Sequence, residues 1–279
     1  MAKIGINDFI DTLLLGSDMF RTLKGVEPIL DTYGRPTFVA GRRGPIFRVR
    51  IGSEHFALKC YSHSASAFEP LHNLLAELHS PLIVAPRLLT QELWVGHCYA
   101  DVSLYAWVDG PTLDWELRRA LRTGEAGHIT HLAESFARLC VELLACEWRH
   151  GDLKPENIII EPSGQMKLID CDGLYHPSLS WQGQAGTPPY VHPKRQDAFD
   201  EHIDDYSIAL IITSLYALAT EPSLFDKELM VTLPSLGTKA HIATLFEGNS
   251  HLMALLDALH SNDYKITHLN HTIQCILHK

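Results

Sequence analysis

The sequence predicts a two-lobed α+β fold, with an antiparallel sheet plus a helix in the N-terminal lobe and mostly helices in the C-terminal lobe. Three observations lead to this prediction. Apolar and polar residues alternate between residues 36 and 61, and glycine-containing turns separate the runs, as is typical of antiparallel strands. Apolar residues recur at the helical period across 128–148. Two short apolar runs, 158–160 and 166–169, flank a Pro-Ser-Gly turn and indicate a β-hairpin within the helical lobe.

The N-terminal part of the chain is expected to hold an extension, a sheet and one helix. Residues 1–21 form the extension, where apolar residues at helical spacing predict a short amphipathic helix that packs on the first lobe. Docking of this helix to a partner is the alternative. The lobe itself covers 22–105. Its strands are expected at 37–40, 46–51, 55–61, 84–96 and 97–108, and its helix at 70–79.

The C-terminal lobe, 106–279, is expected to be helical apart from the hairpin. Helices are predicted at 115–122, 128–148, 208–219, 251–260 and 268–278. The helix at 208–219 is apolar nearly all round, so we expect it to be buried, and it is too short to span a bilayer.

Composition restricts the class of protein. A length of 279 residues with 46% hydrophobic content allows a two-lobed domain with a sizeable core. The formal net charge of −10 argues against a nucleic-acid or anionic-membrane surface. The six cysteines form no C-x-x-C pair, which argues against a zinc site and fits reduced thiols. The acidic N-terminus lacks the basic region of a secretory signal, so we expect a cytoplasmic protein without membrane insertion.

Polar residues gather at one end of the predicted hairpin. The stretch before its first strand reads H-G-D-L-K-P-E-N (150–157), and the stretch from the end of its second strand reads L-I-D-C-D-G (168–173). Because an antiparallel hairpin brings its two ends together, Asp152, Lys154 and Asn157 should lie beside Asp170. Mg²⁺ prefers oxygen ligands and usually keeps waters and substrate phosphates in its shell. The pattern therefore predicts a site for Mg²⁺ and phosphate.

The octapeptide resembles the catalytic loop of protein kinases, with Gly151 in place of the family's Arg, and L-I-D-C-D-G resembles the family's D-F-G segment. The resemblance implies transfer of the ATP γ-phosphate, with Asp152 as the base that faces the acceptor hydroxyl and Lys154 on the transferred phosphate. It implies that Asn157 and Asp170 hold Mg²⁺. An ordinary polar turn is the alternative, but a hairpin followed by a second match argues against it.

The first lobe carries further resemblances. Phe56-Ala57-Leu58-Lys59 resembles the V-A-I-K strand, which implies that Lys59 binds the α- and β-phosphates; a solvent-facing edge-strand lysine is the alternative. The stretch 41–45 resembles the phosphate-covering loop, with Gly41 and Gly44 retained and Arg42 and Arg43 adding charge; an ordinary hairpin turn is the alternative.

A carboxylate on the helix after this strand pairs with the lysine in the family. The candidates here are Glu69 and Glu77, of which we select Glu69. The stretch 104–110 resembles the linker between the lobes, which implies that backbone groups from Ala106 to Val108 contact adenine.

Two stretches of the second lobe complete the resemblance. D-D-Y-S (204–207) resembles the start of the family's central helix, which implies that Asp204 accepts hydrogen bonds from the loop around His150; a carboxylate favoured by the helix dipole is the alternative. The stretch 186–195 resembles G-T-x-x-Y-x-A-P-E, with His-Pro-Lys in place of Ala-Pro-Glu, so Lys194 cannot make the family's ion pair. A similar Y-x-H-P-K-R signature occurs in a bacterial group of atypical Ser/Thr kinase-like proteins.

Three functions remain open. A Ser/Thr protein kinase that uses Mg²⁺ and ATP is favoured by Lys154-Pro155-Glu156-Asn157 and by the 186–195 stretch. A small-molecule kinase is the second, because His-Gly-Asp is common in that branch of the family. A non-catalytic ATP-binding scaffold is the third. Because Gly151 offers no arginine side chain, we also predict that the enzyme does not need phosphate on Thr187, Ser178 or Ser180.

Overall fold

The computed structural model describes residues 4–41, 43–180, 186–195, 198–227, 229, 233 and 236–278. The chain divides into two compact units, Met1–Val108 and Asp109–Lys279. The first is built on an antiparallel sheet and the second is mostly helical, so the predicted α+β class is confirmed. The boundary between the units falls inside the stretch 104–110 that resembles a linker.

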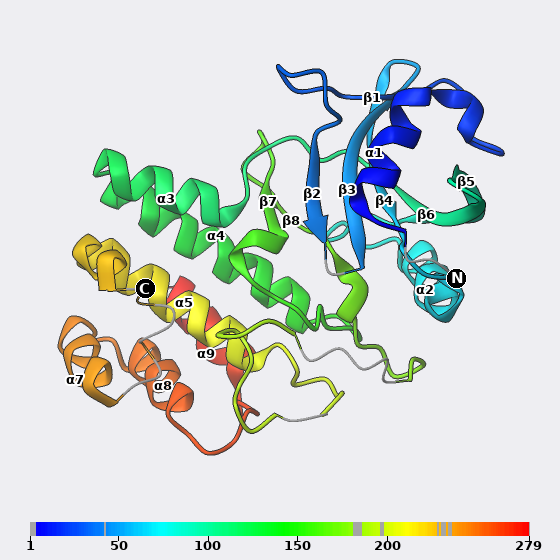
Figure 1. Ribbon diagram of the computed structural model, residues 1–279. Coiled ribbons are helices and arrows are strands. Elements are labelled where there is room, and N and C mark those ends of the chain that lie inside the picture. The colour runs from blue at the N-terminus through cyan, green and yellow to red at the C-terminus, as the bar shows by residue number, and fades with distance from the viewer. Residues whose placement is uncertain are drawn as a thin grey trace. The chain divides into compact units, whose positions relative to one another are not determined.

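The sheet of the first unit has six strands (Figure 1). Their order is β1-β3-β4-β6-β5, and β2 pairs with β3. The strands are β1 (Val26–Pro28), β2 (Phe38–Gly41), β3 (Gly44–Ile51), β4 (Glu54–Cys60), β5 (Arg87–Val95) and β6 (Cys98–Ala106). All five predicted strands are confirmed. The short β1 was not predicted, because three residues are too few to show a period.

The N-terminal segment belongs to the core of this unit. Its helix α1 (Ile6–Leu15) follows the predicted pattern, and Phe9 and Leu13 are buried in one cluster with Phe47, Leu58 and other sheet residues. The prediction that this helix packs on the first lobe is confirmed. Helix α1 is therefore part of the folded unit. A second helix, α2 (Glu69–Leu78), begins with Pro70 in its first turn, as predicted.

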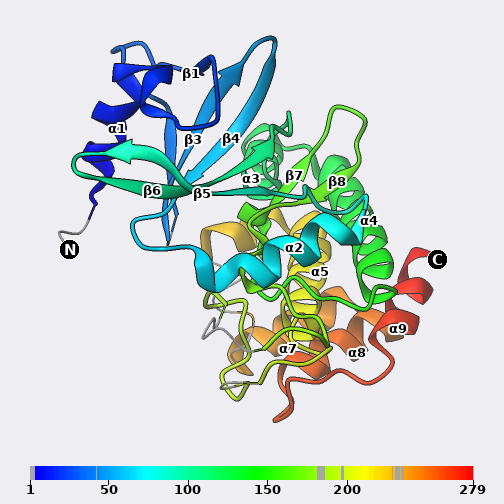
Figure 2. The same ribbon diagram turned by 90° about the vertical axis from the view of Figure 1, so that its right-hand side faces the viewer.

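The second unit consists mostly of helices that pack on one another. The helices are α3 (Leu113–Thr123), α4 (Ala126–Leu144), α5 (Asp205–Thr220), α7 (Leu236–Leu245), α8 (Ser250–Leu259) and α9 (Leu269–Leu277). Helix α5 is buried along nearly its whole length, as its apolar sequence predicts, and α4 and α8 contact it (Figure 2). Helix α4 ends earlier than predicted because Arg149 turns back and donates from Nη1 to the carbonyls of Leu143 and Cys146, at 3.2 and 2.8 Å.

The hairpin is confirmed as β7 (Ile158–Ile160) and β8 (Met166–Leu168), in antiparallel register with Ile158 opposite Leu168. It is joined to the start of α3, since Ile160 donates its N–H to the carbonyl of Pro111 at 2.9 Å. These contacts give the hairpin a fixed position within the second unit.

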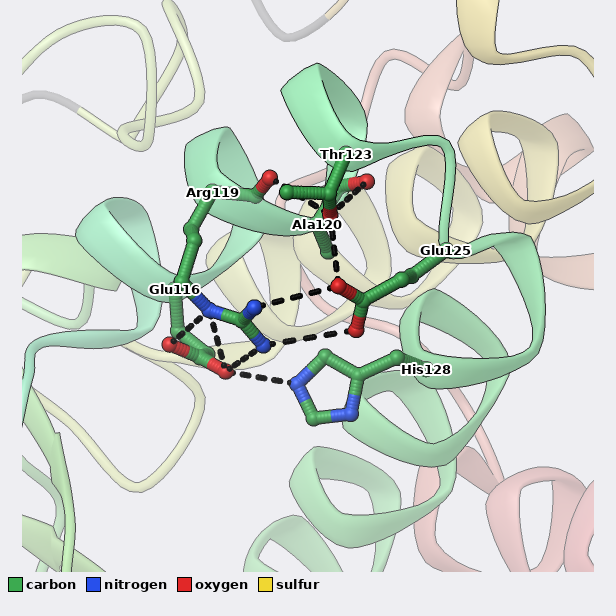
Figure 3. Close-up of polar contacts among 6 residues, drawn as sticks. All are labelled: Glu116, Arg119, Ala120, Thr123, Glu125 and His128. Atoms are coloured by element: carbon green, nitrogen blue, oxygen red, sulfur yellow. Dashed lines mark hydrogen bonds and ion pairs between the residues drawn. The ribbon is translucent and has the colours of Figure 1, made fainter.

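A charged network fixes the corner between α3 and α4 (Figure 3). The guanidinium of Arg119 bridges the carboxylates of Glu116, at 2.7 Å, and Glu125, at 3.1 Å. The Nε2 atom of His128 lies 2.7 Å from Oε1 of Glu116. Hydrogen bonds from Arg119 lower the pKa of Glu116, so this carboxylate stays ionised. Within the described part of the chain, none of the helices is long and apolar enough to cross a membrane.

Candidate active site

A buried carboxylate holds the loop 150–157 in place. Asp204, immediately before α5, is 1% exposed and accepts hydrogen bonds from the backbone N–H groups of His150, at 2.5 Å, and Gly151, at 2.9 Å. These are the contacts that the kinase resemblance led us to expect for Asp204. Charge-assisted bonds of this kind are stronger than neutral ones, so the start of the loop has a rigid support.

The buried imidazole of His150 ties this loop to the end of the hairpin. Its Nε2 donates to the carbonyl of Ile169, at 2.9 Å, and its Nδ1 accepts from the N–H of Asp152, at 3.3 Å. Each nitrogen therefore has one role, as a neutral ring requires. On the other side of the hairpin end, Ile169 donates to the carbonyl of Asn157 at 2.9 Å. The two polar stretches around the hairpin thus lie side by side, as predicted.

Gly151 occupies a position where a residue with a Cβ atom would force the surrounding backbone to shift. Its φ is +79°, and a Cβ atom built on it would lie 1.9 Å from the carbonyl oxygen of Gly173. The segment after Gly173 cannot retreat easily, because Tyr175 and Arg149 exchange two backbone hydrogen bonds of 2.9 and 3.0 Å. The departure from the family's Arg is therefore built into the local backbone.

Lys154 joins two side chains that are distant in sequence. Its Nζ lies 3.3 Å from Oδ2 of Asp152 and donates to Oγ1 of Thr187 at 3.0 Å. Both the Asp152 and Lys154 side chains are 20% exposed, so the carboxylate and the ammonium remain partly accessible to solvent.

Oxygen ligands suitable for Mg²⁺ come from the two ends of the hairpin. The side-chain amide of Asn157 donates from Nδ2 to the carbonyl of Asp152 at 2.9 Å, which leaves its Oδ1 as a candidate metal ligand. Asp170 follows Ile169 directly and has a left-handed backbone, with φ 58° and ψ 53°. Such strain in a non-glycine residue is found most often at functional sites. One amide oxygen and one carboxylate fit a cation that completes its shell with water and phosphate.

Lys59 is buried in the middle of the first unit's sheet. It is 2% exposed on β4, which lies between β3 and β6, so the alternative of a solvent-facing edge lysine is wrong. Its Cα lies opposite Ser103 of β6, and its Nζ lies 6.0 Å from the centre of the Tyr61 ring.

The structure does not bring Glu69 to Lys59. Glu69 is exposed in the first turn of α2, and among the described residues it makes no ion pair. The buried face of α2 instead presents His72, whose Nδ1 donates to the carbonyl of Phe68 at 2.8 Å and whose Nε2 lies 2.9 Å from Oγ of Ser103. The hydroxyl of Tyr61 lies 3.0 Å from the same Oγ. Hydrogen bonds of His72 therefore join α2 to the sheet next to Lys59.

The glycines of the loop 41–45 have a structural role of their own. Gly41 and Gly44 are opposite each other in the β2–β3 ladder, and a Cβ on Gly44 would lie 1.8 Å from the carbonyl oxygen of Cys60. The guanidinium of Arg43 lies 3.6 Å from the centre of the Phe68 ring, a cation–π contact. Arg42 lies outside the described residues.

The stretch expected to contact adenine ends the first unit. Trp107 donates its N–H to the carbonyl of His55 on β4, at 3.0 Å. Backbone groups of successive residues in an extended strand point to opposite sides, so those of Ala106, the last residue of β6, point away from β4.

The segment 186–195 is tied to the loop 261–266. Lys194 donates from Nζ to Oδ1 of Asn262, at 2.6 Å, in an exposed hydrogen bond. Shortly after the segment, Asp200 accepts from the hydroxyl of Tyr264, at 2.6 Å, and pairs with Lys265 at 3.0 Å. Different residues therefore supply the anchor that Lys194 cannot form.

Sequence reasoning missed two residues of this site. Thr187 was considered only as a place for phosphate, and its contact with Lys154 spans 33 positions of the chain. His72 was not singled out, because a histidine on an amphipathic helix is usually an ordinary partly buried residue. The only sequence indication was its place one turn from Leu75 on the apolar face of 70–79.

Comparison with known proteins finds protein kinases. The chain is 27% identical over 194 residues to Aurora kinase C of Mus musculus, which covers 65% of this chain and 68% of that protein. It is 32% identical over 102 residues to a dual specificity mitogen-activated protein kinase kinase of Caenorhabditis elegans, covering 33% and 23%. It is 27% identical over 124 residues to an Aurora kinase of Patiria pectinifera, covering 42% and 30%. The chain thus spans less than a third of the latter two relatives. No family model matches the chain.

Proposed function

We propose that this protein is a Mg²⁺- and ATP-dependent phosphotransferase, and specifically a Ser/Thr protein kinase. The observation that supports this most is the convergence of Asp152, Lys154 and Asn157 on one side of the hairpin end, with Asp170 adjoining on the other. The similarity to several protein kinases supports the same reaction class.

The proposed reaction is transfer of the ATP γ-phosphoryl group to a hydroxyl. The acceptor oxygen bonds to the γ-phosphorus, the bond from that phosphorus to the β,γ-bridging oxygen breaks, and the hydroxyl proton passes to Asp152. Lys154 stabilises the charge on the transferred group. In such reactions the protein contributes mainly orientation and electrostatic stabilisation, rather than covalent chemistry.

The nucleotide would be held by residues from both parts of the sequence. Asn157 and Asp170 would hold Mg²⁺, which supplies charge neutralisation at the phosphates. Lys59 would contact the α- and β-phosphates. Backbone groups at Gly41 and Gly44 and at Ala106 and Val108 would contact the phosphates and the adenine edge, respectively. Glu69 has no role in this proposal, because it is exposed whereas Lys59 is buried.

Transfer to a protein is favoured over transfer to a small molecule. The relatives are named as protein kinases, and the 186–195 segment lies against the proposed catalytic Lys154 through Thr187. Membership of the bacterial group with the Y-x-H-P-K-R signature is part of this proposal and rests on the sequence alone. A non-catalytic scaffold would bind ATP in the same way but transfer nothing.

The Asp152→Asn variant tests the proposed reaction. It should bind Mg·ATP like the wild type, because the base acts on the acceptor, and its single-turnover transfer to a Ser/Thr peptide library should fall by about 10²–10⁴-fold. Glu147→Gln, the same change at an exposed position five residues upstream, is the matched control and should transfer normally. Unchanged transfer by Asp152→Asn would remove the proposed base. Binding without transfer by the wild type would instead support the scaffold.

A further inference from the structure

Arg195 is a buried cation that the proposed reaction does not use. Its side chain is 4% exposed, and Nη1 donates to the carbonyl of Ile203 at 3.1 Å. Its Nε is buried and has no hydrogen-bond partner among the described residues. Removing a guanidinium from water is costly, so a protein retains one in such a place only where nearby groups compensate for it.

Two glycines make room for this side chain. Gly186 has φ +73°, and a Cβ built on it would lie 3.2 Å from the carbonyl oxygen of Gly151 and 3.7 Å from Nη2 of Arg195. The same Cβ would lie 2.6 Å from Cγ2 of Val191. The start of the segment 186–195 is therefore packed directly against Gly151, and the guanidinium from the end of the segment lies beside them both.

Two carboxylates act on the same guanidinium: that of Asp152 in the loop 150–157 and that of Asp204, which holds this loop in place. Burial lowers the pKa of Arg195, while the charges of Asp204 and Asp152 oppose that change. Oδ1 of Asp152 is also buried without a hydrogen-bond partner among the described residues. Gly151, Asp152 and Arg195 line one narrow space, in which the attraction is screened less than in open water.

We propose that Arg195 is a positioning residue that clamps the segment 186–195 onto the catalytic loop at Gly151. This inference rests on the proposed function, because it explains how the segment 186–195 is held in place for the proposed phosphoryl transfer. In the family, an Arg at the position of Gly151 binds a phosphate on this segment. Here the backbone at Gly151 excludes a side chain, and a guanidinium supplied by the segment itself occupies the neighbouring space.

The clamp makes phosphate on the segment unnecessary. Oγ1 of Thr187, in this segment, already accepts a hydrogen bond from Nζ of Lys154. The same ammonium group lies 3.3 Å from Oδ2 of Asp152. A phosphate there would add a charge of about −1.5 to −2 beside the Asp152 carboxylate, which is unfavourable by like-charge repulsion. Arg195 supplies the ordering that a phosphate supplies elsewhere.

Three variants of the full chain test the clamp. Arg195→Met removes the charge and keeps the stem, Arg195→Lys restores a cation, and Lys194→Met removes the neighbouring cation that contacts only Asn262 among the described residues. Amide hydrogen exchange is measured for peptides that cover 186–195, together with transfer from labelled ATP to a Ser/Thr peptide library. Exchange needs no activity, so it judges the clamp even if the wild type transfers nothing.

We expect Arg195→Met to exchange the segment's amides at least tenfold faster, and to lose at least tenfold in kcat while KM for ATP stays within twofold. Arg195→Lys should recover part of both, and Lys194→Met should resemble the wild type. If Arg195→Met does not fold, Arg195→Lys decides, with at least threefold faster exchange expected. Equal exchange in the wild type and in the folded Arg195 variant, or equal effects at positions 194 and 195, would overturn the clamp. Lack of transfer by the wild type would contradict only the proposed function.

Discussion

Replacing Gly151 with Ala should destabilise the second unit far more than an ordinary glycine substitution. The added Cβ would meet the carbonyl oxygen of Gly173 at 1.9 Å, and the residue would keep a φ of +79°. A left-handed backbone costs an L-residue about 1–2 kcal/mol. Relieving the overlap requires a backbone shift, and such overpacking costs about 1–3 kcal/mol. The two terms together predict a loss of about 2–5 kcal/mol in the free energy of unfolding.

Gly164, in the turn of the β7–β8 hairpin, provides the matched control. Its φ is +85°, but nothing lies within 4 Å of a Cβ built on it. Gly164→Ala therefore carries only the backbone term, about 1–2 kcal/mol. Urea unfolding followed by tryptophan fluorescence measures both, since Trp148 is 3% exposed and precedes the loop. Equal losses in the two variants would refute the reasoning that steric overlap at Gly173 makes Gly151 obligatory.

Three further predictions concern the site and its support. Mg·ATP should raise the apparent melting temperature of the wild type, and of Asp170→Asn clearly less, because only native-state binding stabilises; equal shifts would remove the metal assignment. Thr187→Val removes one hydrogen bond to Lys154, worth about 0.5–1.5 kcal/mol, so transfer should fall by at most about tenfold with ATP binding unchanged; a thousandfold loss would show a direct chemical role. Burial raises the pKa of Asp205 to about 6, above its unfolded value, so the native state binds the proton more tightly than the unfolded state does. The wild type should therefore lose stability relative to Asp205→Asn as pH rises from about 4 to about 6. A difference in stability that is constant with pH would contradict this.

Local patterns predicted the fold and the centre of the site. The hairpin follows from two apolar runs and a turn, and strand pairing then brings Asn157 next to Ile169 without any knowledge of the tertiary fold. The core helix α5 follows equally from its apolar sequence. In each case residues close in sequence carry the information, and their pattern has only one stable arrangement.

Contacts between distant segments were beyond such patterns. Glu69 was chosen because the family has a Glu on this helix. Whether a side chain reaches the sheet, however, depends on which face of the helix is buried. Leu71, His72 and Leu75 form the buried face of α2, and Glu69 remains in the exposed first turn. The role of Arg195 likewise depends on two left-handed glycines meeting across 35 positions, which no local period encodes.

The central claim is that the end of the β7–β8 hairpin binds Mg²⁺ and the phosphates of ATP. A crystal structure with Mg²⁺ and a non-hydrolysable ATP analogue tests it most directly. The account predicts a metal ion held by Oδ1 of Asn157, the carboxylate of Asp170 and phosphate oxygens, with Lys59 on the α- and β-phosphates. A nucleotide bound elsewhere, or a metal that does not contact Asn157 and Asp170, would contradict it.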